Sequence, residues 1–283
     1  MKIGIFDSGY GGLTILSAIR ERLPEYDYLY LGDNARAPYG TRSFEVIYAY
    51  TLEAVRYLHS CGCRLIILAC NTASAKALRS IQQHDLPEIN SNLPRERQVN
   101  VLGVIRPTVE AVPSITRNGH IGILATPGTV SSQSYVIELE HIAAASGRSL
   151  TITQQPCPMW VPLIEAGEHN SPGADWFVKQ YIDDILSLDK HIDTMVLGCT
   201  HYPLLLPKIS ELLAGTGIRV VAQGGLVADS LSAYLMRHTE IAQDLSRGKS
   251  CTYLTTESAD KFSTSASLFL RQEGIAATTV TLA

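Results

Sequence analysis

Short apolar segments recur along this chain, and stretches with helical periodicity separate them. The segments cover residues 2–6, 28–31, 65–69, 100–105, 120–125, 195–198, 219–222 and 252–255. Strands of this length that alternate with helices are typical of parallel sheets covered by helices. The chain is therefore predicted to adopt an α/β fold with open parallel sheets.

The length of the chain favours a division into two domains. With 283 residues, of which 46% are hydrophobic, it can bury a large core but lies near the length at which single cores split. Two stretches, LIILACNTAS at residues 65–74 and TMVLGCTHYP at residues 194–203, share the order of apolar run, cysteine and polar turn. This internal similarity suggests two related halves.

The cysteines of these two stretches, Cys70 and Cys199, each follow a predicted strand. A buried cysteine is usually a small hydrophobic residue, and this interpretation stays open for either position taken alone. A reactive thiol instead needs a neighbouring base or a positive field, and His201 stands two residues after Cys199. A helix that begins at Asn71 would also lower the pKa of the Cys70 thiol, because the dipole and free N–H groups of its first turn favour thiolate.

Polar residues collect directly after the predicted strands, where α/β sheets bind their ligands. They are Asp7, Ser8, Asp33, Tyr39, Gly40, Cys70, Asn71, Thr72, Ser74, Thr126, Thr129, Cys199, Thr200 and His201. Asp7 and Ser8 could equally cap a helix. The sequence DSGYGG is not G-x-G-x-x-G and precedes no G-K-[ST], so we interpret it as a tight turn beside a small ligand and not as a nucleotide site.

Charge and cysteine usage narrow the possible partners. The net charge is −4, and lysines and arginines are scattered, so neither nucleic acid nor an anionic membrane is expected as a partner. The six cysteines are interpreted as free thiols, because a large intracellular enzyme is a poor setting for disulfides. Cys61 and Cys63 form a C-x-C pair, which lacks the spacing of a structural zinc site, so no metal is expected.

Targeting signals are not apparent in the sequence. The N-terminus, MKIGIFDSG, lacks the longer apolar region and the cleavage site of a signal peptide. No apolar run is long enough for a transmembrane helix. The protein is therefore expected in the cytoplasm.

Five motifs occur in a characteristic order: GIFDSGYGGLT, GDNARAPYG, ACNTASA, LIEAG and LGCTHYP. In this order, and over nearly the whole chain, they resemble the glutamate racemases of the cofactor-independent aspartate/glutamate racemase superfamily. The resemblance implies two pseudo-symmetric α/β lobes with the active site in the cleft between them. It places residues 1–105 and 222–283 in the first lobe and residues 106–221 in the second.

The resemblance also implies a chemistry, the interconversion of L- and D-glutamate by two thiols without a cofactor, which supplies D-glutamate for peptidoglycan. Because a single base would tend to restore the original enantiomer, Cys70 and Cys199 are expected to exchange the roles of thiolate base and thiol acid. Asp7 is expected to assist Cys70, His201 to assist Cys199, and Glu165 to orient His201. Pyridoxal phosphate would need a Schiff-base lysine, and no lysine directly follows a predicted strand.

The substrate is expected to be a small amino acid, glutamate, and a homodimer is the preferred assembly. The resemblance implies that the amino acid is bound by Asp7, Ser8, Tyr39, Gly40, Asn71, Thr72, Thr200 and His201. The hydroxyls of Thr126 and Thr129 are expected to receive the side-chain carboxylate.

Two stretches depart from the family pattern, and both are expected near the hinge. Arg106 and Thr108 stand where an acid and a glycine are expected, and Gln223 and Gly224 replace a stretch of Asp-Ser type. An aspartate or other amino-acid racemase of the same superfamily, and a non-catalytic amino-acid-binding protein, stay open as alternatives. The paired thiols favour a racemase, because a binding site alone needs no acid or base on both faces.

Overall fold

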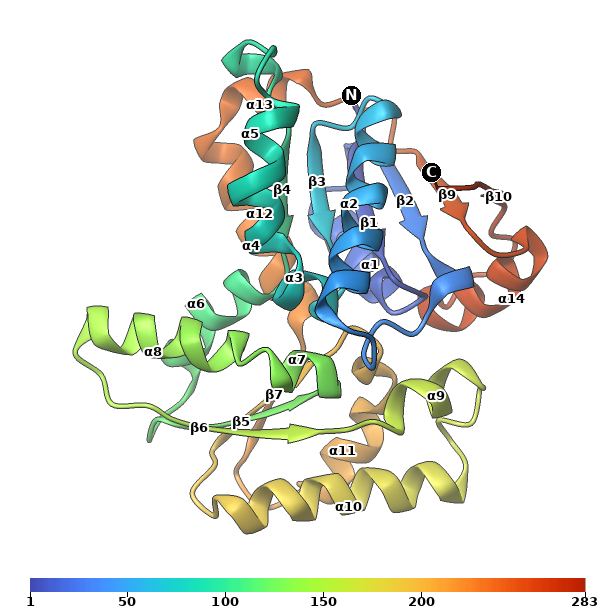
Figure 1. The fold of residues 1–283 in the computed structure, drawn as a ribbon. Helices are drawn as coiled ribbons and strands as arrows, with labels where there is room; N and C mark the ends of the chain where they lie inside the picture. Colours follow the sequence, from blue (N-terminus) through green and yellow to red (C-terminus); the bar gives the residue numbers. More distant parts are fainter. Residues whose placement is uncertain (283) are drawn as a thin grey trace.

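The computed structural model describes residues 1–282 and contains two parallel sheets with helices on both faces of each (Figure 1). The predicted fold class, α/β with two open parallel sheets, is confirmed. The boundaries of the two lobes, near residues 105 and 222, stay a prediction.

The first sheet has six strands, all of them parallel. In spatial order they are β10 (Ala277–Thr279), β9 (Cys251–Thr255), β2 (Tyr28–Gly32), β1 (Ile3–Asp7), β3 (Leu65–Leu68) and β4 (Asn100–Gly103). Figure 1 shows the C-terminal strands, in red, beside the N-terminal strand β2. The two ends of the sequence therefore build one sheet.

The second sheet has four parallel strands from the middle of the chain. In spatial order they are β6 (Thr151–Pro156), β5 (His120–Ala125), β7 (Thr194–Gly198) and β8 (Arg219–Val221). Strand β6 was not predicted from the sequence, because it is a largely polar edge strand, TITQQP, whose residues all stay at least partly exposed. The short strand β10 at the other sheet's edge was missed in the same way.

Helices cover both faces of each sheet, as expected when parallel strands are joined by crossovers. The helices are α1 (Gly12–Arg22), α2 (Phe44–Ser60), α3 (Asn71–Lys76), α4 (Leu78–Ser80), α5 (Leu86–Ile89), α6 (Ile105–Ile115), α7 (Pro127–Ser131), α8 (Ser134–Ser146), α9 (Trp160–Glu165), α10 (Pro172–Leu188), α11 (Leu206–Leu212), α12 (Gln223–Arg237), α13 (Thr239–Asp244) and α14 (Ala259–Leu270). Short 3₁₀ or π turns are η1 (Asn34–Arg36), η2 (Ile81–Asp85), η3 (Arg95–Arg97) and η4 (Tyr202–Leu205). Helix α12 packs against both α1 and α6, so it joins the two halves of the molecule.

Alternation along the strands distributes the core between the two faces of the first sheet. In β2, Tyr28 and Tyr30 pack into the cluster that contains α1 and α14, whereas Leu29 and Leu31 pack into the cluster that contains α2. Every residue of β1, β2 and β3 is buried, which explains why these strands read as continuous apolar runs.

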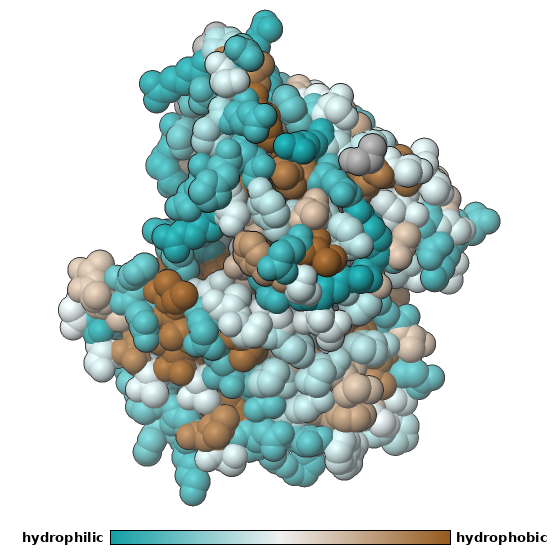
Figure 2. Space-filling model, in the orientation of Figure 1, coloured by the Kyte–Doolittle hydropathy of each residue, from teal (hydrophilic) through white to brown (hydrophobic). Residues whose placement is uncertain are grey.

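The surface in Figure 2 is mostly hydrophilic, with hydrophobic residues gathered where α8 lies. Helix α8 includes Ile137, a large hydrophobic residue whose side chain is exposed. Among residues 1–282, no helix is long and apolar enough to cross a membrane.

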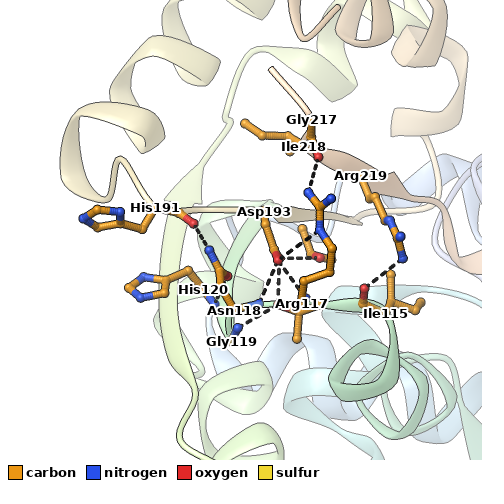
Figure 3. A network of polar contacts seen from close by, with 12 residues as sticks. Ile115, Arg117, Asn118, Gly119, His120, His191, Asp193, Gly217, Ile218 and Arg219 are labelled. Carbon is orange, nitrogen blue, oxygen red and sulfur yellow. Dashed lines mark hydrogen bonds and ion pairs between the residues drawn. The ribbon is translucent and has the colours of Figure 1, made fainter. Parts of the chain in front are cut away.

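A buried carboxylate ties together the loops at one end of the second sheet. Asp193, just before β7, accepts hydrogen bonds from the hydroxyls of Thr116 (2.6 Å) and Thr194 (2.8 Å). Its other oxygen accepts from the backbone N–H groups of Arg117 (2.7 Å) and Asn118 (2.9 Å), which Figure 3 shows. Burial alone would raise the pKa of Asp193, but these four donors outweigh it and lower the pKa to about 2 from the usual 3.8.

We expect Asp193→Asn to destabilise the protein at pH 7 by about 3 kcal/mol. The amide NH₂ group would face donors that hydrogen-bond to a carboxylate oxygen in the wild type, and those donors would be left without an acceptor. A lowered pKa in the folded state contributes stability above the unfolded pKa and loses it as the pH falls. In wild type, the free energy of unfolding should fall between about pH 4 and about pH 2 as Asp193 gains a proton. In the variant this fall should be smaller. Urea denaturation across this range measures both effects, and Asp183→Asn, on the exposed surface of α10, is the control for charge; equal curves for Asp193→Asn and wild type would contradict the prediction.

Candidate active site

A cavity of about 70 Å³ lies where the carboxyl ends of strands from the two sheets meet, and we call it the cleft. Asp7 ends β1 and Cys70 follows β3 in the first sheet, while Thr126 follows β5 and Cys199 follows β7 in the second. Glu165 reaches the cleft from the last turn of α9. The structure therefore brings together residues that are far apart in the sequence at one sheet edge, as the α/β pattern indicated.

All of the predicted site residues except Thr129 line the cleft. Those that line it are Asp7, Ser8, Tyr39, Gly40, Cys70, Asn71, Thr72, Thr126, Glu165, Cys199, Thr200 and His201. Thr129 is fully buried behind the wall, where its hydroxyl lies 3.1 Å from that of Thr126. It supports a residue of the wall without reaching the cleft.

Cys70 caps helix α3, and the cap also orients its sulfur. Its Sγ accepts a hydrogen bond from the N–H of Ala73 (3.4 Å) and lies 3.3 Å from the hydroxyl of Ser8. The N–H of Ala73 at the helix start does lower the pKa of this thiol, but the expectation of a lowered pKa overall is wrong. The pKa is raised to about 12, first by burial and then by the charge of Asp7. The hydrogen bonds from Ser8 and Ala73 only partly oppose this rise.

The carboxyl group of Asp7 is fully buried beside the cleft. Its Oδ2 accepts a hydrogen bond from the N–H of Gly9 (3.0 Å), whereas Oδ1 has no hydrogen-bond partner among the described residues. Burial raises the pKa of Asp7, although the charge of His201 and the N–H groups of Gly9 and Gly12 act in the opposite direction. A carboxyl group with a raised pKa and a free oxygen is suited to exchanging a proton inside the cleft.

Cys199 is the first member of a relay with an imidazole and a carboxylate. Its Sγ lies 3.8 Å from Nδ1 of His201, and Nε2 of His201 lies 2.9 Å from Oε1 of Glu165. Burial lowers the pKa of His201, but the hydrogen bonds and charges of Cys199 and Glu165 outweigh it and raise the pKa well above 6.5. The imidazole ring can therefore hold a proton at neutral pH next to the sulfur.

Glu165→Gln tests this relay through the pH dependence of turnover. Loss of the carboxylate charge removes a contribution that raises the pKa of His201, so the imidazolium should lose its proton at lower pH. Activity that needs the imidazolium is present below this pKa and lost above it, so the alkaline limb of kcat/KM should move to lower pH. The control is Glu168→Gln, which removes the same charge from an exposed position nearby; an alkaline limb that stays in place in Glu165→Gln would contradict the relay.

Hydroxyl groups that follow strands of both sheets also line the cleft. The Oγ1 atoms of Thr72 and Thr126 lie 3.0 Å apart, and Thr126 caps helix α7 by accepting from the N–H of Thr129 (3.4 Å). The N–H of Gly128, in α7, donates to the carbonyl of Gly40 (2.8 Å), so this bond joins α7 to a lining residue of the cleft. The hydroxyl groups of Thr72 and Thr126 are donors suited to a carboxylate.

The hydroxyl of Tyr39 is hydrogen-bonded within the protein and is not directed to a ligand in the cleft. That hydroxyl donates to the buried carboxylate of Asp33 (2.5 Å), which also pairs with Arg36 (2.7 Å). The phenol is thus occupied, and Tyr39 holds the segment that carries Pro38 and Gly40 against the cleft.

One part of the cleft was not predicted from the sequence, namely the segment after β6. Its lining residues are Cys157, Pro158, Val161 and Pro162. The polar sequence of the edge strand β6 hid the strand end, so the residues after it were not considered. The signal that was available is the sequence PCPMW itself, a cysteine between two prolines directly after alternating residues.

The described residues, 1–282, contain no group of three or more His, Cys, Asp or Glu side chains that could hold a metal ion. All six cysteines are free thiols. What the cleft offers chemically is two thiols, a buried carboxyl group, an imidazole–carboxylate pair and a set of hydroxyl donors.

Comparisons with known proteins agree with this description. The sequence model of the family described as Asp/Glu/Hydantoin racemase matches residues 13–230. A glutamate racemase of Ruegeria sp. is 40% identical over 96% of this chain and 98% of its own length, and one of Persephonella marina is 44% identical over 75% of this chain and 74% of its own. The crystal structure of the glutamate racemase isoform RacE1 from Bacillus anthracis superposes with a TM-score of 0.85 at 32% identity, over 99% of this chain and 97% of that one.

Proposed function

The chain belongs to the Asp/Glu/hydantoin racemase family and is a racemase, and we propose that it interconverts L- and D-glutamate without a bound cofactor. One observation supports this most: Cys70 and Cys199 come from different sheets, line the same cleft, and each has its own assisting group. A site with one acid–base group would return the proton to the face from which it came. Two thiols on opposite sides of the bound amino acid can invert the centre.

In one direction, the thiolate of one cysteine takes the α-proton, so that the Cα–H bond breaks and an S–H bond forms. The electron pair stays on the substrate, where hydrogen-bond donors to the α-carboxylate stabilise it. The thiol of the other cysteine then donates its proton to the opposite face of Cα and becomes the thiolate. In the reverse direction the two cysteines exchange roles.

The two thiols need help in different ways. Cys70 is a thiol of raised pKa, and we propose that Asp7 takes or returns its proton as the substrate binds and leaves. Cys199 has His201 beside it, and the imidazole would hold its proton while Glu165 fixes the ring. An unequal pair of this kind can still catalyse both directions, because every proton that one thiol gains is matched by a proton that the other loses.

We propose that the amino acid is held by the predicted binding residues that line the cleft, with the hydroxyls of Thr72 and Thr126 near its side-chain carboxylate. The glutamate racemase of Francisella tularensis, 29% identical over 99% of this chain with a TM-score of 0.82, was solved in complex with D-glutamate. D-Glutamate made by this chain would be supplied to peptidoglycan synthesis in the cytoplasm, and a homodimer is the preferred assembly.

Circular dichroism of the purified protein with each enantiomer of glutamate and of aspartate tests the substrate. We expect both enantiomers of glutamate to reach the same racemic end point, and aspartate to turn over more slowly. Faster turnover of aspartate would favour an aspartate racemase. Binding of glutamate by calorimetry without any turnover would favour a non-catalytic binding protein.

A further inference from the structure

Behind the cleft, a buried hydrogen-bonded network joins Asn71 to three residues that the proposed mechanism does not use. Nδ2 of Asn71 donates to Oε1 of Gln223 (2.6 Å), and the hydroxyl of Tyr135 donates to Oδ1 of Asn71 (2.7 Å). Nε2 of Gln223 lies 2.8 Å from the hydroxyl of Tyr135 and 2.9 Å from that of Thr108. The four residues are at most 2% exposed, so the network is shielded from bulk solvent.

Donors and acceptors in this network have one consistent arrangement. The hydroxyl of Thr108 donates to the carbonyl of Val104 (3.0 Å), so its oxygen accepts one N–H of Gln223. The second N–H of Gln223 goes to Tyr135, whose own proton then goes to Oδ1 of Asn71. Reversing the Gln223 amide would bring its oxygen to the carbonyl of Val104, which lies 3.3 Å from the present Nε2, and two acceptors would then face each other.

The arrangement fixes the orientation of the Asn71 amide. Asn71 lines the cleft, and the hydrogen bonds of the described residues use one of its two Nδ2–H groups. A free asparagine amide can turn over and present either oxygen or N–H to a ligand. Here Tyr135 donates to the oxygen and Gln223 accepts one N–H, so the amide is fixed with its second N–H available to a ligand. A donor of this kind suits a carboxylate.

We propose that Tyr135 and Gln223 are positioning residues, which hold the amide of Asn71 so that it offers an N–H to a carboxylate of the substrate. This inference rests on the proposed function. The network also crosses the molecule, because Asn71 begins α3, Tyr135 lies in α8, Thr108 in α6 and Gln223 begins α12. Two of its members, Thr108 and Gln223, are positions at which the sequence departs from the family pattern.

Tyr135→Phe tests the inference, since it keeps the buried ring and removes only the hydroxyl. We expect KM for both enantiomers of glutamate to rise about tenfold, the worth of one hydrogen bond to a charged group, while kcat changes less. Thr108→Val removes a more distant member of the network without touching Asn71, and a smaller rise of about threefold is expected. The matched control is Tyr28→Phe, which removes another buried hydroxyl (2.6 Å to the carbonyl of Leu23) far from the cleft and should leave KM unchanged.

A double-mutant cycle separates positioning from a general loss of stability. Asn71→Ala should raise KM by itself, and adding Tyr135→Phe to it should cause no further rise, because the hydroxyl acts through Asn71. The inference is overturned if Tyr135→Phe leaves KM at the wild-type value, or if its effect is the same in the Asn71→Ala background. Wild-type protein that does not racemise glutamate would overturn the proposed function, and this inference with it, which is a different outcome from active wild type with an unaffected Tyr135→Phe.

Discussion

Cys70→Ser and Cys199→Ser should each abolish the racemisation of glutamate in both directions, with a loss of about 10³-fold or more. A serine hydroxyl is far too weak an acid to lose its proton at neutral pH, so it cannot provide a base in place of the thiolate. Inversion needs an acid–base group on each face of the substrate. The loss should be the same whether the reaction starts from L- or D-glutamate, because the equilibrium between enantiomers is fixed at one. Polarimetry or circular dichroism from each enantiomer measures it.

The control for this prediction is Cys63→Ser, which changes a thiol that is also buried but does not line the cleft. It should retain racemisation. Thermal unfolding of all three variants distinguishes lost chemistry from lost folding. Unfolding of Cys70→Ser or Cys199→Ser would instead favour the interpretation of that cysteine as a small buried hydrophobic residue.

Gly11→Ala should lower kcat/KM by about 10²-fold, although it adds a single methyl group at a residue that does not line the cleft. The backbone of Gly11 is ordinary, with φ −59° and ψ −35°, so alanine is not strained there. A Cβ atom at Gly11 would, however, lie 2.3 Å from Nδ1 of His201 and 2.6 Å from Oγ1 of Thr200. These residues come from the other sheet, so the methyl group must either displace the imidazole from Cys199 or hold the two halves apart.

Gly225→Ala is the matched control, because a Cβ atom there would meet no other atom within 4 Å. It lies in helix α12, where alanine is the better helix former, so its stability should be equal or higher. Steady-state kinetics of both variants against wild type give the comparison. A Gly11→Ala enzyme with wild-type kcat/KM would show that the close approach of the two halves at this point is not needed for turnover.

The sequence predicted the parts of the site that follow apolar strands. Cys70 and Cys199 were found because their strands are buried on both faces, which makes them continuous apolar runs that end visibly. The segment around Cys157 was missed because its strand is a polar edge strand. The difference is physical, since edge strands need no apolar pattern and leave little trace in the sequence.

The pKa values and hydrogen bonds that depend on burial could not be predicted from the sequence. The start of α3 does donate to Cys70, as expected, yet burial outweighs it and raises the pKa of the thiol. Likewise Gln223 was noticed only as a departure from a pattern, and its link to Asn71 depends on contacts between residues 152 positions apart. Neither result follows from spacing, because both depend on what packs around the group.

The two-thiol mechanism is tested most directly with 3-chloroglutamate, whose chloride leaves once the α-proton has been removed. Loss of HCl forms a carbon–carbon double bond, and the resulting enamine hydrolyses to 2-oxoglutarate and ammonia, so one abstraction by one thiol is enough for a signal. Cys70→Ser keeps the thiol of Cys199, and Cys199→Ser keeps that of Cys70. Each variant should therefore release ammonia from one α-configuration only, and the two should choose opposite configurations; the same preference in both variants, or racemisation of glutamate by either, would contradict the mechanism.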